Sequence, residues 1–339
     1  MTPTPALCLE YLPLPDGGAR LIRLYGETPC PVLPAAVDGL PLTELGPYCF
    51  APRQRERLLP PAGTLRRYTV PAAPRGRYDF GDDTPADPTQ MPRIAGKILE
   101  QITLPDNLRL LGEACFYDCR ALRQISLSSR LAVVSSDALT NTMALTRLTV
   151  RAAPTEPCGV QRLLAALPGE TAVEYQTAAG MQTVLWFPEY WEDITEVPAH
   201  MLIPTFSGQG YHYRQCFTVA GAVDFKEYDA VLAQTGEGDE PATLAAMAFD
   251  RLRYPEQLTP AAADRYRAYL AAQGLLCVQR FLQTQDLDAL RTLLGMELLS
   301  PDALRQGGDL ARAADNAEAA ALFAGALRGK ARRRQYRFD

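Results

Sequence analysis

Apolar residues recur at a fixed interval through the first half of the chain. Three apolar triads lie 23 residues apart, namely Leu99, Ile102 and Leu104, then Leu122, Ile125 and Leu127, then Leu145, Leu148 and Val150. A single unit of this L-x-x-I-x-L pattern cannot bury its apolar side, so successive units must stack and cover one another. A period of this length is typical of a solenoid. We therefore predict a β-rich solenoid with 23-residue repeats.

The segments that flank these triads predict how the solenoid begins and ends. Two apolar runs at 7–12 and 20–25 enclose a Pro-Asp-Gly-Gly turn, which is typical of a hairpin that caps the first repeat. Residues 65–70 repeat the strand pattern, and a polar loop is inserted at 75–92. Its carboxylates Asp82, Asp83 and Asp87 lack the order of a calcium loop, so a solvated loop is expected. A short helix at 161–167 and strands at 172–176 and 182–187 are expected to close this domain near residue 185.

The second half changes in composition. Residues 186–220 form an aromatic-rich joint that contains both tryptophans and both histidines, and residues 221–339 are rich in alanine and leucine. Six helices are predicted there, at 240–253, 260–273, 275–283, 286–294, 301–314 and 316–327. Asp286 and Asn316 are expected as N-caps, and Gly274 and Gly295 as helix ends. Short connections favour antiparallel helical hairpins, so we predict an all-α domain.

A recurring signature accompanies the 23-residue period. It consists of a strand that ends in proline, a later apolar-Gly pair and a Cys-Phe pair, as in Leu104-Pro105, Leu111-Gly112, Cys115-Phe116 with Cys119, and earlier in Leu33-Pro34, Leu45-Gly46 and Cys49-Phe50. This signature resembles the BspA-like leucine-rich repeats, which occur mostly in bacteria. The next copy departs from it, with Ser128 and Ser135 in place of proline and glycine. The resemblance implies an α/β leucine-rich-repeat solenoid over roughly the first half and says little about chemistry.

Charge and cysteine content narrow the classes of function. The net charge is -5, but the last twelve residues carry +5, so the rest of the chain carries -10 and is not expected to bind nucleic acid. The basic tail could contact acidic lipids, RNA or an acidic partner, or could simply follow the last helix at the negative end of its dipole. Cys49 and Cys115 align with Ala138, so free structural thiols are expected, and no zinc pattern is present.

The start of the chain bears on its compartment. It shows no secretory signal, and no apolar run is long enough to cross a membrane. A cytoplasmic protein is therefore expected. A surface or secreted protein is the alternative if the start has been trimmed.

Two functional classes remain. The first is a non-catalytic protein–protein interaction module that uses polar positions alternating with the buried ones: Arg67, Thr69, Gln101, Thr103, Gln124, Ser126, Arg147 and Thr149. These side chains are uncharged or cationic and suit an acidic or peptide partner. The second is a hydrolase-type enzyme at 186–217, with candidate residues Glu189, Trp191, His200, His212 and Cys216.

The residues of the joint decide between the two classes. Cys216 lies four residues from His212, within reach on one helical turn, but no known nucleophile context surrounds it. The acids Glu189, Glu192, Asp193 and Glu196 could pair for glycoside hydrolysis, although their spacing in sequence does not fix the distance that this chemistry needs. The two histidines do not complete a metal set, and no cofactor motif is present. The sequence therefore favours the interaction module, without metal or cofactor.

Overall fold

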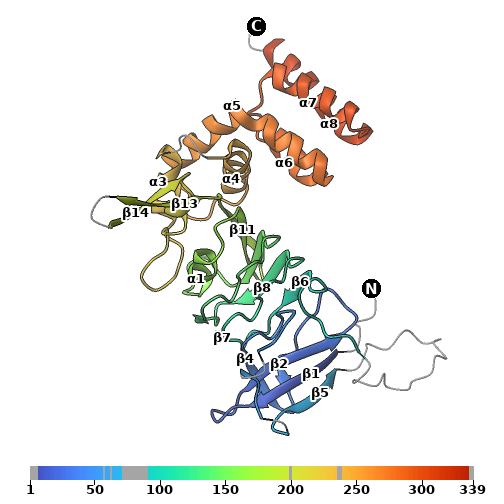
Figure 1. Cartoon of the computed structure of the whole chain (residues 1–339). Coiled ribbons are helices and arrows are strands. Elements are labelled where there is room, and N and C mark those ends of the chain that lie inside the picture. Colours follow the sequence, from blue (N-terminus) through green and yellow to red (C-terminus); the bar gives the residue numbers. More distant parts are fainter. Residues whose placement is uncertain are drawn as a thin grey trace, which may run out of the picture. The chain divides into compact units, whose positions relative to one another are not determined.

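A computed structural model describes residues 7–55, 58–61, 63–70, 91–197, 201–234 and 239–335 (Figure 1). The chain divides into two compact units, Met1–Gly180 with Arg214–Asp224, and Met181–Tyr213 with Phe225–Asp339. We call them the solenoid unit and the helical unit. The predicted joint at 186–220 is thus divided between them after Tyr213. The inserted loop up to residue 90, including its three aspartates, and His200 lie outside the described residues.

The solenoid unit begins with the predicted hairpin. Strands β1 (Leu7–Pro13) and β2 (Ala19–Gly26) pair antiparallel, and Gly17 in the turn has a φ of 83°, which glycine adopts without strain. Strand β5 (Arg66–Val70) pairs antiparallel with the other edge of β1. The prediction that residues 65–70 form a repeat strand is therefore wrong. Three of the five residues of β5 are exposed and none is buried, so this strand has little apolar surface to place inside a stack.

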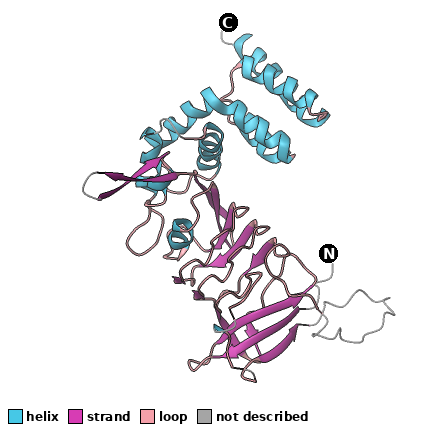
Figure 2. Cartoon of the chain, viewed as in Figure 1, coloured by secondary structure: helices cyan, strands magenta, loops and turns pink. Residues whose placement is uncertain are grey.

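The repeats build two parallel ladders. One contains β6 (Gln101–Thr103), β8 (Gln124–Ser128), β10 (Arg147–Arg151) and β11 (Thr171–Thr177). The other runs from β2 through β4 (Leu40–Leu45), β7 (Leu110–Leu111) and β9 (Val133–Val134), with β3 (Ala36–Val37) beside β4. Figure 2 shows these strands in magenta. Ile125 pairs with Ile102 on one side and with Leu148 on the other, which confirms the 23-residue register.

The interior of the stack is filled by the residues that the repeat pattern predicts. The rings of Phe50 and Phe116 stack with centroids 5.2 Å apart and planes 5° apart, and both side chains are fully buried, as are those of Ile125 and Leu148. The backbone follows the same stack, because the amide of Phe116 donates to the carbonyl of Ala138 at 2.9 Å. The predicted core is confirmed.

The cysteines behave as the sequence predicts. None of the eight forms a disulfide, and Cys49 and Cys115 are fully buried in the stack. Burial raises the pKa of Cys119 to about 12 and also raises the pKa values of Cys49 and Cys115. Because the thiolate is the reactive form, these three thiols are suited to packing and not to nucleophilic chemistry. Helix α1 (Val160–Ala165) follows the last repeat.

The helical unit combines short strands with a helical array. Its elements are β12 (Gly180–Phe187), β13 (Trp191–Val197), β14 (Met201–Ser207), α2 (Gly210–Tyr213), α3 (Phe225–Val231), a 3₁₀ turn (Leu232–Gln234), α4 (Pro241–Arg253), α5 (Pro260–Thr284), α6 (Leu287–Gly295), α7 (Pro301–Ala313) and α8 (Ala317–Gln335). The antiparallel hairpin of β13 and β14 was not predicted. The predicted N-caps are confirmed, since Asp286 accepts from the amide of Ala289 at 2.9 Å and Asn316 from that of Ala319 at 3.0 Å.

Two predictions about the helices are wrong. Gly274 does not end a helix but lies inside α5, where a Cβ atom would come within 2.5 Å of the Leu299 side chain. The glycine is there because another part of the unit packs closely against it. The basic residues from Arg328 to residue 334 do not follow the last helix either, because α8 continues to Gln335.

Candidate interaction surface

Six of the eight predicted surface residues form two rows across one sheet. Gln101, Gln124 and Arg147 are register partners on β6, β8 and β10, and Thr103, Ser126 and Thr149 form the second row. We call these six residues, together with Glu174, the polar ladder. Glu174 belongs to it because β11 pairs Thr149 with Glu174. Parallel strands lie about 4.8 Å apart, so each row presents one side chain at that interval.

Hydrogen bonds fix the β11 end of the polar ladder. Gln124 Nε2 donates to Thr149 Oγ1 at 3.0 Å, and Thr149 Oγ1 donates to Glu174 Oε2 at 3.1 Å. Arg147 Nη1 forms an ion pair with the other carboxylate oxygen of Glu174. Thr149 is 6% exposed and Glu174 is 9% exposed. The charge of Arg147 is therefore compensated, and the surface is less cationic than the sequence suggested.

A second arginine fixes the next positions along the strands. Arg151 Nη1 donates to Ser126 Oγ at 2.6 Å, and its guanidinium also reaches Asp106 Oδ1 at 2.7 Å. Sequence reasoning missed Arg151, Asp106 and Glu174. Arg151 could have been found by extending the alternation of polar positions two residues past Thr149. Glu174 could have been found by applying the same alternation to the strand predicted at 172–176. Asp106 follows β6 in a turn, where no alternation marks it.

The first edge of this sheet is covered by a proline-containing segment. Glu100 N donates to Pro29 O at 2.8 Å, Thr103 N donates to Pro31 O at 3.0 Å, and Leu33 N donates back to Thr103 O at 3.0 Å. Proline has no backbone N–H, so this segment cannot form a regular hydrogen-bonded ladder with a further strand. A partner at this edge must therefore use the side chains of the face and not backbone pairing.

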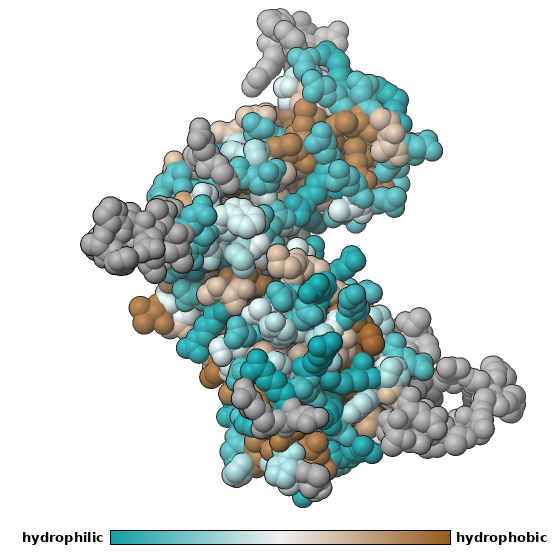
Figure 3. Space-filling model, viewed as in Figure 1, coloured by the Kyte–Doolittle hydropathy of each residue, from teal (hydrophilic) through white to brown (hydrophobic). Residues whose placement is uncertain are grey.

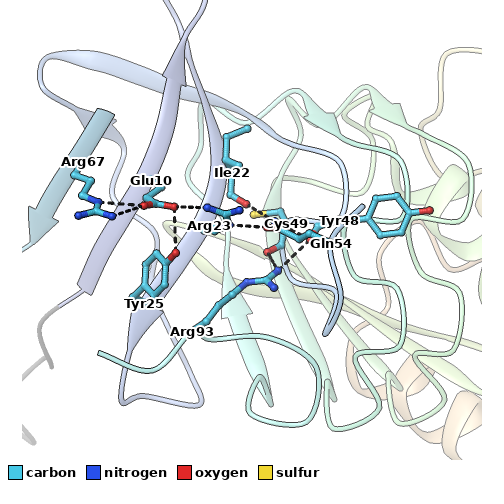
Figure 4. A network of polar contacts seen from close by, with 9 residues as sticks. All are labelled: Glu10, Ile22, Arg23, Tyr25, Tyr48, Cys49, Gln54, Arg67 and Arg93. Carbon is cyan, nitrogen blue, oxygen red and sulfur yellow. Dashed lines mark hydrogen bonds and ion pairs between the residues drawn. The ribbon is translucent and has the colours of Figure 1, made fainter. Parts of the chain in front are cut away.

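The other two predicted residues lie elsewhere. Arg67 and Thr69 are on β5, in the antiparallel cap, and Arg67 contacts the buried carboxylate of Glu10 at 2.9 and 3.1 Å (Figure 4). Arg23 at 2.9 Å and Tyr25 at 3.1 Å donate to the same carboxylate. Burial favours the protonated form of Glu10, but these hydrogen bonds outweigh it and lower its pKa. Arg67 therefore ties β5 to β1 and β2, away from the polar ladder.

Three backbone carbonyls next to this cap accept hydrogen bonds from a third arginine, Arg93. Arg93 Nη2 donates to the carbonyls of Cys49 at 2.9 Å and of Tyr48 at 3.2 Å (Figure 4). It also donates to the carbonyl of Ala51 at 2.9 Å. Gln54 bridges the two groups, because its Oε1 accepts from Arg23 at 2.6 Å and its Nε2 donates to Ile22 O at 3.0 Å. This cluster satisfies backbone and charged groups that the cap would otherwise bury, which is a structural role.

The alternative site at 186–217 is divided by the fold. His212 is exposed and belongs to the helical unit, whereas Cys216 is 5% exposed and belongs to the solenoid unit. Cys216 lies two residues after Arg214, whose buried guanidinium donates to Leu167 O and Gly169 O at 2.7 Å each. The segment that carries Cys216 therefore closes the end of the solenoid after α1.

The remaining residues of the alternative site are on the surface of the helical unit. Glu189 is exposed and Trp191 is 68% exposed, while Tyr211 stacks on Phe206 with centroids 4.1 Å apart. The aromatic residues pack against one another, as expected for bulky rings in a small fold. Among the described residues, no group of three His, Cys, Asp or Glu side chains could hold a metal ion. The helices of the described residues also lack an apolar segment of the length that a bilayer requires.

Comparison with known proteins identifies the repeat. Residues 95–156 match the family described as "BspA type Leucine rich repeat region (6 copies)". Residues 95–156 are thus a BspA-type leucine-rich repeat region, which confirms the resemblance noted in the sequence. Among solved structures, the T. pallidum leucine rich repeat protein (TpLRR) is 19% identical, with a TM-score of 0.27, and the match covers 44% of this chain and 54% of that one. The chain therefore spans about half the length of that relative. No curated protein matches the chain.

Proposed function

We propose that the chain is a non-catalytic interaction module and that the polar ladder binds an extended segment of a protein partner. The observation that supports this most is the hydrogen-bonded set Gln124, Thr149, Glu174 and Arg147. These side chains are held in place before a partner arrives, so binding orders fewer side chains and loses less entropy. A leucine-rich-repeat scaffold is consistent with protein interaction.

The exposed groups define what the partner must offer. Gln101 and Arg147 are exposed, and Thr103, Gln124 and Ser126 are half-buried. Amide and hydroxyl groups both donate and accept hydrogen bonds. A polypeptide with exposed backbone amides and carbonyls satisfies both kinds of group, whereas a purely anionic ligand satisfies only the donors. The covered β6 edge is consistent with recognition through side chains.

The test is capture of proteins from the source organism's lysate by the immobilised chain. We expect a triple variant, Gln101→Ala with Gln124→Ala and Arg147→Ala, to lose the captured protein. The matched control is Arg109→Ala with Val133→Ala, which removes one exposed side chain next to β7 and one on β9, in the other ladder of the same solenoid. Melting curves establish that both variants fold. Capture that survives the triple variant but is lost when Glu189, Trp191 and His212 are replaced would contradict the proposal and place the site in the helical unit.

A further inference from the structure

The last three helices enclose a small pocket. It has a volume of about 100 Å³ and is lined by Leu294, Glu297, Leu299, Leu304, Ala326, Gly329 and Lys330. Leu294 lies on α6, Leu304 on α7 and Ala326 on α8. Figure 3 shows apolar residues at the surface in the region where Figure 1 labels α6, α7 and α8. A cavity of about 150 Å³ with leucine-type walls accommodates benzene, so this pocket is of the size that takes one aliphatic side chain.

Lys330 brings a positive charge to the mouth of the pocket. Its Nζ donates to Glu297 O at 3.1 Å and to Leu299 O. An ammonium group has three N–H donors, so two of them hold the loop after α6 and one remains for a ligand. The apolar floor and this donor thus lie within one pocket.

The sequence adjacent to the pocket is strongly basic. From Arg328 to Arg337 it contains six basic residues and no acidic ones, and α8 extends this stretch past the pocket to Gln335. Two of these cations, Arg328 and Lys330, flank the pocket-lining Gly329, so positive charge lies next to the apolar lining.

We propose that this pocket binds an acidic peptide segment of another protein, with one leucine-sized side chain in the pocket and carboxylates against Arg328 and Lys330. Charge complementarity selects the acidic flanks, because clustered cations attract carboxylates over several ångströms. The apolar lining of the pocket favours a leucine-sized side chain as the residue of the peptide that inserts into it. A nucleic acid does not fit as well, because the pocket offers no aromatic ring on which a base could stack. The proposal concerns the helical unit and is independent of the polar ladder.

The experiment uses the full chain and a fluorescein-labelled nonapeptide of four aspartates, one leucine and four aspartates. We expect saturable binding in fluorescence anisotropy and a loss of at least tenfold in affinity in Ala326→Leu, which fills the pocket. The matched control is Ala324→Leu, because Ala324 is exposed on α8 and does not line the pocket. It should change the affinity less than twofold. Lys330→Gln should also weaken binding.

A second arm leaves the protein unchanged. Replacing the central leucine of the peptide by serine should cost at least tenfold in affinity, so the pocket is tested even if Ala326→Leu fails to fold. Equal binding of the leucine and serine peptides would overturn the proposal, as would unchanged binding by a folded Ala326→Leu variant. Binding of single-stranded RNA or phosphatidylserine vesicles more tightly than the leucine peptide, with no effect of Ala326→Leu, would assign the basic end to those ligands instead.

Discussion

Replacing Asp229 by asparagine should cost the helical unit about 3 to 5 kcal/mol of unfolding free energy. Asp229 accepts from Arg251 Nε at 2.9 Å and from Arg251 Nη2 at 2.9 Å, and Tyr266 Oη donates to the same carboxylate at 2.7 Å. The side chains of Arg251 and Asp229 are 0% and 5% exposed. Desolvation lowers the pKa of Arg251, but the hydrogen bonds and charge of Asp229 raise it overall, so the buried guanidinium stays charged.

The magnitude follows from what asparagine leaves behind. It keeps the shape and one oxygen, but it removes the negative charge and directs an NH₂ group toward a guanidinium donor. A hydrogen bond to a charged group is worth about 1.5 to 3 kcal/mol, and the arginine also loses its buried counter-charge. The control is Asp309→Asn, whose partner Arg312 and own side chain are 65% and 68% exposed. An exposed pair contributes at most about 1 kcal/mol, so this variant should be nearly neutral.

Urea unfolding followed by tryptophan fluorescence measures the effect. Both tryptophans, Trp186 and Trp191, lie in the helical unit, which is the unit that contains Asp229 and Arg251. A loss below about 1 kcal/mol in Asp229→Asn, equal to the control, would refute the reasoning. The double variant Asp229→Leu with Arg251→Met should lose less than Asp229→Asn, since a buried ion pair can be replaced by apolar side chains at little cost.

Three further predictions concern stability. Phe116→Ala should cost about 3 to 5 kcal/mol in thermal unfolding, because the ring is fully buried against Phe50; an unchanged melting temperature would remove it from the core. Gly274→Ala should cost about 1 to 3 kcal/mol because its Cβ would meet Leu299 at 2.5 Å, whereas Gly325→Ala, with nothing within 4 Å, should gain up to about 1 kcal/mol. The hydrogen bonds that lower the pKa of Glu10 also contribute to the unfolding free energy. This contribution is fully present above the ordinary glutamate pKa of about 4.3 and is lost as the pH falls through the lowered pKa. In Glu10→Gln, the unfolding free energy measured by urea titration should therefore fall less steeply between about pH 5 and 2.

The repeat region could be predicted because the spacing of its apolar residues in the sequence indicates which of them are buried. Ile125 and Leu148 recur at the period of the stack and are both fully buried. Gly112 in the signature is also explained locally, since a Cβ there would lie 2.7 Å from the backbone of Gly46 in the preceding turn. Where each residue contacts its own equivalent in the next repeat, the sequence pattern contains the tertiary contact.

The errors arise where a contact joins unlike segments. β5 repeats the strand pattern but pairs with β1, and Gly274 resembles a helix end although Leu299 is what requires it. An isolated glycine weakens a helix by about 1 kcal/mol, so the sequence favoured a break. The β13–β14 hairpin was missed because Glu192 and Asp193 interrupt its apolar pattern and the sequence offered no partner strand.

The same distinction applies to the polar ladder. The sequence placed Gln101, Gln124 and Arg147 in one row because they are 23 residues apart. The pairing of Arg147 with Glu174 was missed because the alternation was not extended to β11, which lies beyond the last regular repeat. The expectation of a cationic surface came from counting only the repeat positions.

The two proposed surfaces differ in charge balance, so they should bind different kinds of partner segment. On the polar ladder, Arg147 and Arg151 are already paired with Glu174 and Asp106, so a strongly acidic partner would have to displace carboxylates that the fold supplies. Neutral amides and hydroxyls can bind there without breaking either pair. At the end of α8 the sequence supplies six cations and no acid between Arg328 and Arg337, so acidic flanks gain attraction there that they would not find on the ladder. A partner that uses both surfaces must therefore present a neutral extended segment to the solenoid unit and a separate acidic segment to the helical unit. Raising the salt concentration should weaken the second contact far more than the first, because screening acts mainly on exposed charges.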